Sequence, residues 1–455
     1  MCATRSWISI RPAETEPLKV SVDQPAPKIG RYRWVICGLL FAATAINYID
    51  RQTIGVLKPT LQAELRWTES SYADIVFWFQ CAYAIGYLAF GSIIDRIGAR
   101  LGYALAFSVW TLAHIGHGFV HSITQFALMR FTLGLGESGS FPASLKSVSE
   151  WFPQKERALA VGVFNAGSNL GAIITPIVVP AITLAWGWRA AFIATGAVTF
   201  MWLIAWLAVY RSPNAHKKLS AAELEFIRSS DEPTTAAAGM AAATSRAGVS
   251  WLKLLKLKET WAYALGKFLT DPIWWLYLFW LPDFLSKRHG LDLKSFGPPL
   301  VAIYLLSDIG SVAGGWGSSR LMKIGRTVNA ARKIIMLICA VAVVPILFAQ
   351  FVSQLWIAVV IIGVAAAAHQ AWSANLMTLP SDMFPRAAVG SVVGIGGMAG
   401  AVGGMLMSQY NGYILGVFGS YQPIFALAGG AYIVAIVVIH FLSPKLTRVT
   451  EEAVG

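Results

Sequence analysis

The chain has 455 residues, of which 56% are hydrophobic and only 13% are charged, and its formal net charge is +13. Soluble domains contain roughly 25% charged residues, so this composition, with a mean hydropathy of +0.59, excludes an ordinary soluble domain and predicts a polytopic membrane protein. The excess of cations does not indicate nucleic acid, because most of them stand between apolar segments, where they set membrane topology.

The N-terminal 30 residues are polar and contain four prolines and several charges. We therefore expect residues 1–30 to be a disordered cytosolic tail without a cleavable signal peptide. Cys37, Cys81 and Cys339 all fall within apolar segments, so we expect neither a disulfide framework nor a metal site, and no cofactor.

Twelve apolar segments follow, each about 18–28 residues long and therefore long enough to cross a membrane as a helix. The predicted fold class is an all-α integral membrane protein with twelve transmembrane helices in two pseudo-symmetric six-helix bundles. The predicted spans are 32–52, 70–92, 99–119, 122–147, 156–181, 187–209, 258–284, 297–318, 330–350, 354–379, 386–415 and 420–441.

Residues 211–257 interrupt this pattern. They contain an Ala/Thr-rich run and a short amphipathic piece, Trp-Leu-Lys-Leu-Leu-Lys-Leu-Lys, which predicts a cytosolic linker with an interfacial helix rather than a span. The linker divides the chain into an N-terminal bundle at 31–210 and a C-terminal bundle at 258–443, followed by a cytosolic tail at 444–455.

Lysine and arginine in the short loops predict the orientation. Arg96, Arg100, the linker, the stretch 320–333 and the C-terminal tail all fall on one side, although Lys287 and Arg288 fall on the other. An even number of spans places both termini on the basic side, so we expect a multi-pass protein of the cell (inner) membrane with both termini in the cytoplasm. We expect a monomer.

The two halves carry similar motifs. Glu-Trp-Phe-Pro at 150–153 precedes the fifth span, and Asp-Met-Phe-Pro at 382–385 precedes the eleventh. Weak internal symmetry of this kind is typical of transporters built from repeats, with a site between the halves near the midplane. A Gly-x-x-x-Asp-Arg-x-Gly-x-Arg motif follows the second span, and we interpret it as a conformational gate with Asp95 as the latch. The motif consists of Gly91, Asp95, Arg96, Gly98 and Arg100.

The fourth span carries Arg130 and Glu137 within a long apolar run. An ionisable group at membrane depth costs at least about 2.5–3.5 kcal/mol, so it normally faces a cavity or a partner. The two residues are close to two helical turns apart and point to the same side, about 10 Å apart along the axis. An ion pair that only locks helices is the alternative to a functional pair.

These motifs resemble the major facilitator superfamily, and more narrowly its anion:cation symporter branch. The resemblance covers about residues 30–445 and is carried by the motifs at 47–51, 91–100, 130–142 and 151–162. Phe-Asn-Ala-Gly-Ser at 164–168 and Lys-Phe-Leu-Thr-Asp-Pro-Ile-Trp-Trp at 267–275 resemble the hexuronate transporters in particular.

The resemblance implies a proton-coupling group and a substrate site. Asp50 and Glu137 match protonation sites, Arg130 matches the cation that neutralises Glu137, and Arg51 matches the arginine that meets the substrate carboxylate. From position alone, Asp50 and Arg51 could equally be a solvated helix end. The further substrate candidates of the N-terminal half are Tyr48, Tyr83, Asn165, Ser168 and Asn169.

In the C-terminal half, Lys267 and Asp271 stand one turn apart beside Pro272. They form either an ion pair with no role in substrate binding or a pair that contacts the substrate. Asp308 is a second candidate partner of Lys267. We expect Trp274 or Trp275 to stack on the apolar face of a sugar. The histidines near a short outer loop, His114, His117 and His121, give no functional signal. The remaining candidates of this half are His369, Gln370 and Ser373.

No phosphate-binding loop of an ATP-driven pump is present, so an ion gradient must supply the driving force. The resemblance implies that the chain is not an enzyme but a transporter that imports a hexuronate such as glucuronate or galacturonate in symport with protons. The alternatives are a proton-coupled symporter of another small organic anion, such as an aldonate, an aromatic acid or a dicarboxylate, and a transport-dead membrane sensor.

Overall fold

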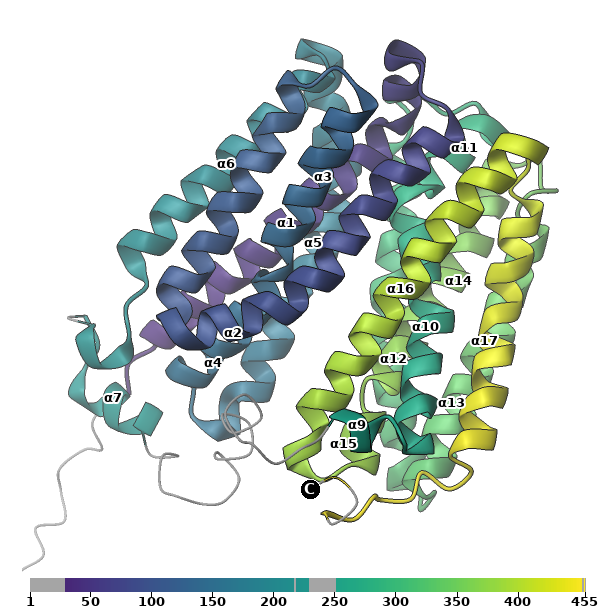
Figure 1. The fold of residues 1–455 in the computed structure, drawn as a ribbon. Coiled ribbons are helices and arrows are strands. Elements are labelled where there is room, and N and C mark those ends of the chain that lie inside the picture. The colour runs from purple at the N-terminus through teal and green to yellow at the C-terminus, as the bar shows by residue number, and fades with distance from the viewer. Residues whose placement is uncertain (1–28, 217, 229–250, 452–453, 455) are drawn as a thin grey trace, which may run out of the picture.

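The computed structural model describes residues 29–216, 218–228, 251–451 and 454, and within them every regular element is a helix. Two groups of long helices stand side by side (Figure 1). The first comprises α1 (Tyr32–Leu65), α2 (Glu69–Gly116), η1 (His117–Phe119), α3 (Ile123–Ser138), α4 (Ser140–Trp151), α5 (Gln154–Trp186) and α6 (Trp188–Val209). The second comprises α10 (Lys258–Phe279), α11 (Leu281–His289), α12 (Gly297–Lys323), α13 (Val328–Val343), η3 (Val344–Phe348), α14 (Leu355–Leu376), α15 (Leu379–Met383), α16 (Arg386–Phe418) and α17 (Gln422–Leu442).

Nine helical stretches of the described residues are long and apolar enough to cross a membrane. The other three predicted spans are helical too. The predicted span 99–119 is the second part of α2, which continues past a non-helical Gly98, while 122–147 and 258–284 are each divided, at Gly139 and at Trp280. The predicted all-α membrane fold is therefore confirmed.

The largest boundary error concerns the first span, which we predicted to end at residue 52. The helix α1 continues to Leu65, and Asp50 and Arg51 are buried in its middle rather than solvated at its end. The polar run after residue 46 ended the apolar pattern, but those side chains are buried against other helices. Tertiary packing therefore stabilises the last part of α1, residues 53–65, which the hydrophobic pattern does not predict to be a membrane span.

The internal symmetry predicted from the repeated motifs extends to the backbone. Pro153 and Pro385 both stand immediately before a long helix, with ψ of 151° in each case. Gly98 and Gly325, in the corresponding loops of the two halves, have φ of +81° and +89°. Side chains disfavour this left-handed region, which explains why glycine occupies both loops.

The linker has one helix that the sequence analysis missed, α7 (Ala221–Arg228), besides the short η2 (Pro213–Ala215) and α9 (Trp251–Leu254). Glu223 of α7 accepts hydrogen bonds from the backbone N–H groups of Tyr32 and Arg33, at 3.1 Å each. These donors belong to the first turn of α1 and have no partner within the helix, so α7 caps α1. We call the end of the molecule that carries α7, α9 and the C-terminus the linker end (Figure 1).

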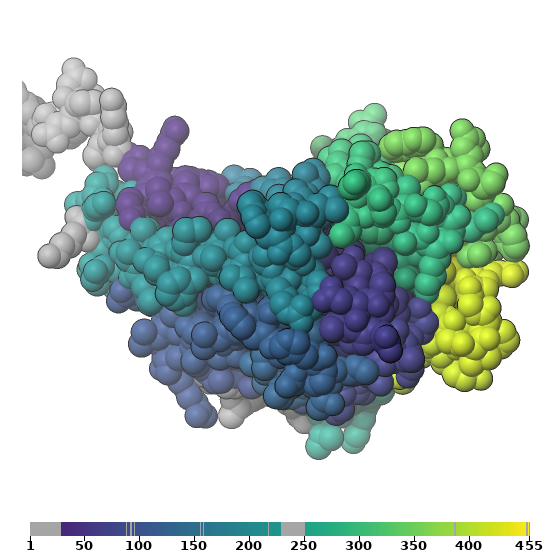
Figure 2. Space-filling view, turned by 90° about the horizontal axis from the view of Figure 1, so that it is seen from above, coloured from purple at the N-terminus to yellow at the C-terminus, as the bar shows by residue number. Residues whose placement is uncertain are grey.

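The two halves meet mainly along α2 and α16 and along α5 and α12. Viewed from above, onto the end opposite the linker, the purple and blue N-terminal half abuts the green and yellow C-terminal half (Figure 2). At Gly55 of α1 an added Cβ would lie 2.5 Å from the carbonyl oxygen of Leu278. A backbone approach this close requires glycine, so α1 and α10 are in direct contact there.

Candidate functional site

Arg51 is the cation at the centre of the contact between the halves. Its Nε donates to Oε2 of Glu137 at 2.9 Å, and its Nη2 donates to Oδ1 of Asn47 at 2.8 Å. Aromatic rings surround the guanidinium at 4.9–5.3 Å from their centroids, a distance at which cations are attracted to the ring face. These rings are Tyr48, Tyr83 and Trp275, the last from the C-terminal half.

The cation paired with Glu137 is not the one that we predicted. Glu137 is fully buried and its recorded ion pair is with Arg51, whereas Arg130 donates to the backbone oxygen of Arg51 at 3.1 Å and lies over the ring of Phe79. Arg130 and Glu137 share one face of the bundle, but two helical turns keep their groups apart, and Arg51 reaches Glu137 from the facing helix. Arg130 supports the pair by electrostatic attraction from one side.

Asp50, although adjacent to Arg51 in sequence, points in another direction. Successive residues of a helix are rotated by about 100°, so Asp50 faces the interior of the N-terminal bundle. Its Oδ2 accepts hydrogen bonds from Trp110 Nε1 at 2.7 Å and from Thr199 Oγ1 at 2.8 Å. His114 Nε2 lies 3.1 Å from the other oxygen, Oδ1. The carboxylate is fully buried, so the two predicted coupling acids occupy separate surroundings.

Glycines allow the helix of Glu137 to pack closely against α2. A Cβ at Gly134 would lie 2.4 Å from the carbonyl oxygen of Phe79, and one at Gly136 would lie 2.6 Å from the backbone nitrogen of Trp110. At these distances a side chain would force the helices apart. The close contact fixes the position of Glu137 relative to α2.

In the C-terminal half, the Lys267 Nζ lies 2.6 Å from Oδ2 of Asp271. Asp271 is therefore the recorded partner of Lys267, and the predicted alternative, Asp308, is a half-buried residue on α12 with no ion pair recorded among the described residues. Trp274 is stacked on the ring of His369, with 5.3 Å between centroids and 6° between planes. His369 in turn shares a hydrogen bond of 2.5 Å with Tyr432.

The other predicted polar residues are less closely connected. Ser168 donates to the backbone oxygen of Asn165 at 2.7 Å and contacts Asn169, so part of this polar stripe satisfies itself. Asn165 is exposed, and Gln370 and Ser373 are half-buried. Trp275 lies beside Arg51, whereas Trp274 lies beside His369, so the two adjacent tryptophans line different parts of the interface.

The predicted gate motif forms the turn between the two parts of α2. Arg100 donates from Nη2 to the carbonyl oxygen of Leu207 at the end of α6, at 2.6 Å, which is a contact within the N-terminal half. Arg96 is exposed and Gly91 is helical. The side chain of Asp95, the proposed latch, lies outside the described part of the chain, so its role stays a prediction.

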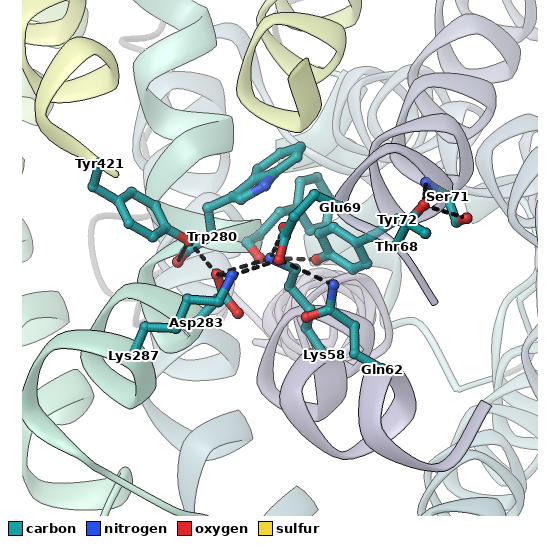
Figure 3. A network of polar contacts seen from close by, with 11 residues as sticks. Lys58, Gln62, Thr68, Glu69, Ser71, Tyr72, Trp280, Asp283, Lys287 and Tyr421 are labelled. Carbon is teal, nitrogen blue, oxygen red and sulfur yellow. Dashed lines mark hydrogen bonds and ion pairs between the residues drawn. The ribbon is translucent and has the colours of Figure 1, made fainter. Parts of the chain in front are cut away.

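A network of charged residues joins the halves at the end opposite the linker (Figure 3). Lys58 Nζ lies 2.7 Å from Glu69 and 2.8 Å from Asp283, and Lys287 contacts both carboxylates. Tyr421 donates to Asp283 at 2.5 Å. Nearby, Tyr72 donates to the backbone oxygen of Phe279 at 2.8 Å across the same boundary.

Sequence analysis missed this network. Each of its charges stands near the end of a predicted span, where a lone charge normally faces water. The only signal was the exception to the orientation rule at Lys287, a cation on the less basic side. Lys58 is nonetheless fully buried, because the two carboxylates of the network neutralise it.

A family comparison bears on what this site does. The family model described as Major Facilitator Superfamily matches residues 40–408. The chain belongs to this superfamily. It is therefore a multi-pass membrane transporter, and the predicted family is confirmed.

Curated relatives and solved structures agree with this assignment. The hexuronate transporter of Escherichia coli (strain K12) is 31% identical over 402 residues, which cover 88% of this chain and 91% of that protein. The galacturonate transporter of Dickeya chrysanthemi is 34% identical over 289 residues, covering 64% of this chain and 82% of that protein. Among solved structures, the xylose transporter XylE from E. coli in its inward open conformation has a TM-score of 0.70 at 16% identity, covering 91% of this chain and 97% of that one.

Proposed function

We propose that this transporter imports a hexuronate, glucuronate or galacturonate, together with protons. The observation that carries the proposal is the surroundings of Arg51: a guanidinium paired with a buried carboxylate and surrounded by three aromatic rings. A planar guanidinium binds a carboxylate through two parallel hydrogen bonds, and aromatic rings suit the apolar C–H faces of a sugar. The names of the relatives, hexuronate and galacturonate transporter, support the same substrate class.

Coupling follows from competition for Arg51. While Glu137 is ionised it holds the guanidinium at 2.9 Å, and an arriving substrate carboxylate must replace it. A proton on Glu137 removes the competing charge and frees the guanidinium, so substrate and proton favour each other's binding. Lys267 and Asp271 then face the substrate from the C-terminal half, where the pair forms hydrogen bonds with the hydroxyl groups of the sugar ring.

We also infer which end faces the cytoplasm. The ion pairs that cross between the halves lie at the end opposite the linker, which they hold closed. Asn165 is exposed about a third of the way along α5, inside its membrane-spanning stretch, and we infer that a polar amide in that position faces water rather than lipid. The site is thus reached from the linker end, and the basic loops place that end, with both termini, in the cytoplasm.

The test is uptake of labelled glucuronate by purified transporter in proteoliposomes, with an inward proton gradient as the only driving force. Unlabelled glucuronate, galacturonate, an aldonate, a dicarboxylate and glucose compete in separate arms. The two hexuronates should compete best and glucose should not compete. If the dicarboxylate or the aldonate competes most strongly, the substrate is another organic anion. Uptake at the same rate with and without the proton gradient refutes the symport. No uptake of any of the acids would favour the sensor.

A further inference from the structure

The interior of the N-terminal bundle holds two histidines that the site described above does not use. His114 lies on α2 and His117 begins η1, and both are fully buried. Their neighbour His121 lies in the exposed loop at the end opposite the linker. The two buried histidines thus lie between that end of the molecule and Asp50, whereas His121 lies outside the buried interior.

Hydrogen bonds fix which nitrogen of His114 carries a proton. Nε2 lies 2.7 Å from the hydroxyl oxygen of Thr195, and that hydroxyl donates its own proton to the backbone oxygen of Ala191 at 2.9 Å. A hydroxyl has a single proton to donate, so it must accept from the ring. Nε2 is therefore protonated and donates to Thr195, with Asp50 Oδ1 3.1 Å away, and Nδ1 carries the lone pair.

The same reasoning applies to His117. Its Nδ1 lies 2.8 Å from the backbone oxygen of Ala113, and a carbonyl can only accept, so Nδ1 carries the proton. Both lone-pair nitrogens, His114 Nδ1 and His117 Nε2, are buried without a hydrogen-bond partner among the described residues. Buried polar atoms are nearly always paired, so two such atoms on adjacent rings require an explanation. Each is in a position to accept a proton without any change in the orientation of its ring.

We propose that Asp50 and His114 together hold the coupling proton on its way to Glu137, and that this proton arrives past His117. This inference rests on the proposed proton symport and deepens it. The proton comes from a hydronium ion, whose O–H bond breaks to leave water, and it bonds to the lone pair of His114 Nδ1. The Nε2–H remains directed at Thr195, with Asp50 Oδ1 3.1 Å from Nε2. The pair thereby changes from a net charge of −1 to zero.

Of the charged groups that face the two rings, Asp50 favours a proton on His114 and Arg130 opposes one. Asp50 is the anion that faces His114, and neutralising a buried carboxylate removes a large desolvation cost. Arg130 of α3 is the cation that faces both rings, and Glu137 of the same helix faces Asp50. From α6 only the hydroxyls of Thr195 and Thr199 face the pair, together with the ring of Phe192.

Asp50 and the two histidines lie apart from Arg51, so a proton can bind there without occupying the substrate site. Asp50 and Arg51 are consecutive, but one faces the bundle interior and the other faces the boundary between the halves. The centroids of the two histidine rings are 6.1 Å apart, a spacing that one water molecule can bridge. The proton thus reaches α1 without passing Arg51 or the boundary between the halves, and a change in the charge beside Asp50 acts on the helix that carries Arg51.

Packing alone is the competing explanation, because His114 bonds to α6 and His117 stacks on Phe192 at 5.0 Å. His114→Gln separates the two explanations, since the glutamine amide still donates to Thr195 but cannot take up a proton. Reconstituted transporter is assayed for glucuronate accumulation under a proton gradient of one pH unit and for counterflow exchange, which needs no net proton movement. One coupled proton supports about tenfold accumulation in wild type.

We expect His114→Gln and Asp50→Asn each to show no accumulation of glucuronate above the outside concentration, while counterflow stays within about twofold of wild type. Full accumulation by His114→Gln, or an equal loss of accumulation and counterflow, overturns the proposal. His117→Gln is the second variant and decides the matter if His114→Gln does not assemble: its initial rate of driven uptake should fall several fold with an unchanged plateau. A wild-type initial rate in His117→Gln overturns the proposal.

His121→Gln is the matched control, because this histidine lies in the exposed loop and should change neither readout. The two proposals fail in different ways. Wild-type protein that shows no gradient-driven accumulation refutes the symport itself. Wild-type protein that accumulates substrate beside an equally active His114→Gln refutes only the role of the histidines.

Discussion

The charged network at the end opposite the linker predicts how the transporter changes conformation. Two of its contacts cross between the halves, Lys58 with Asp283 and Lys287 with Glu69. Two others stay within a half, Lys58 with Glu69 and Lys287 with Asp283 (Figure 3). When the halves separate at this end, each half therefore keeps one neutral pair, and opening breaks the crossing contacts without leaving an unpaired charge.

Glu69→Gln should shift the equilibrium toward the conformation that is open at this end. The variant removes the crossing partner of Lys287 and leaves two cations sharing Asp283 in the closed state. A charge-assisted hydrogen bond contributes roughly 1.5–3 kcal/mol, but Lys287 is 44% exposed, so solvent screening reduces the loss to about 1 kcal/mol. That corresponds to about a fivefold change in the ratio of the two conformations.

Pulsed electron paramagnetic resonance in lipid nanodiscs measures this ratio. Spin labels on Phe119→Cys and Phe351→Cys, which are exposed on opposite halves at this end, report the separation in a background with Cys2, Cys37, Cys81 and Cys339 replaced by alanine. The population with the shorter distance should fall in Glu69→Gln. An unchanged or larger short-distance population would show that the network does not hold this end closed.

Glu64→Gln supplies the matched control. Glu64 pairs with Arg189 at the same end of the molecule, at 3.3 Å, but both residues belong to the N-terminal half and both side chains are about a third to a half exposed. The charge removed is the same and no contact between the halves is lost. The distance distribution should match that of the unsubstituted protein.

Four further predictions concern the substrate site and the gate. Arg51→Ala should weaken glucuronate binding at least about 100-fold in a tryptophan-quench titration, because a carboxylate loses its two-pronged partner; Arg51→Lys, which keeps the charge, should restore little, and unchanged affinity would exclude this role. Glu137→Gln should retain binding and exchange but lose gradient-driven accumulation, since its amide still accepts from Arg51 but no longer titrates; wild-type accumulation would show that it is not a coupling group. Lys267→Ala should lower glucuronate uptake strongly while glucose remains untransported, and an unaffected rate would leave Lys267 with only its pairing to Asp271. Asp95→Asn should slow transport with affinity within a few fold, as a change in conformational equilibrium requires; a large loss of affinity at a normal transport rate contradicts the latch.

The sequence predicted the fold well because the dominant signal, long apolar segments with repeated loop motifs, is local. Gly98 and Gly325 mark the same turn in the two halves, and the proline before α5 has its counterpart before α16. Residue-level prediction of partners was less successful. The family motif located Arg51 and Glu137, but only the facing position of α1 and α3 pairs them with each other and leaves Arg130 to one side.

Two groups of residues escaped prediction for the same physical reason. Lys58, Glu69 and Asp283 each stand near the end of a predicted span, where single charges are expected to be solvated, and their mutual neutralisation depends on contacts across more than 200 residues of sequence. His114 and His117 looked unremarkable because nothing in the sequence places them beside Asp50. Signals of this kind exist only between helices, so a pattern read along one helix does not contain them.

The position of α1 connects these features. Within one helix, Asp50 faces the bundle interior, Arg51 faces the substrate boundary and Lys58 faces the closing network, two turns further on. An α-helix transmits displacement along its axis as a stiff unit, and Gly55 holds this one directly against the backbone of α10. A charge change at Asp50, release of Arg51 by Glu137 and separation of Lys58 from Asp283 thus all act on the position of α1. Coupling between proton, substrate and conformation then requires no separate relay, because one helix carries a residue for each.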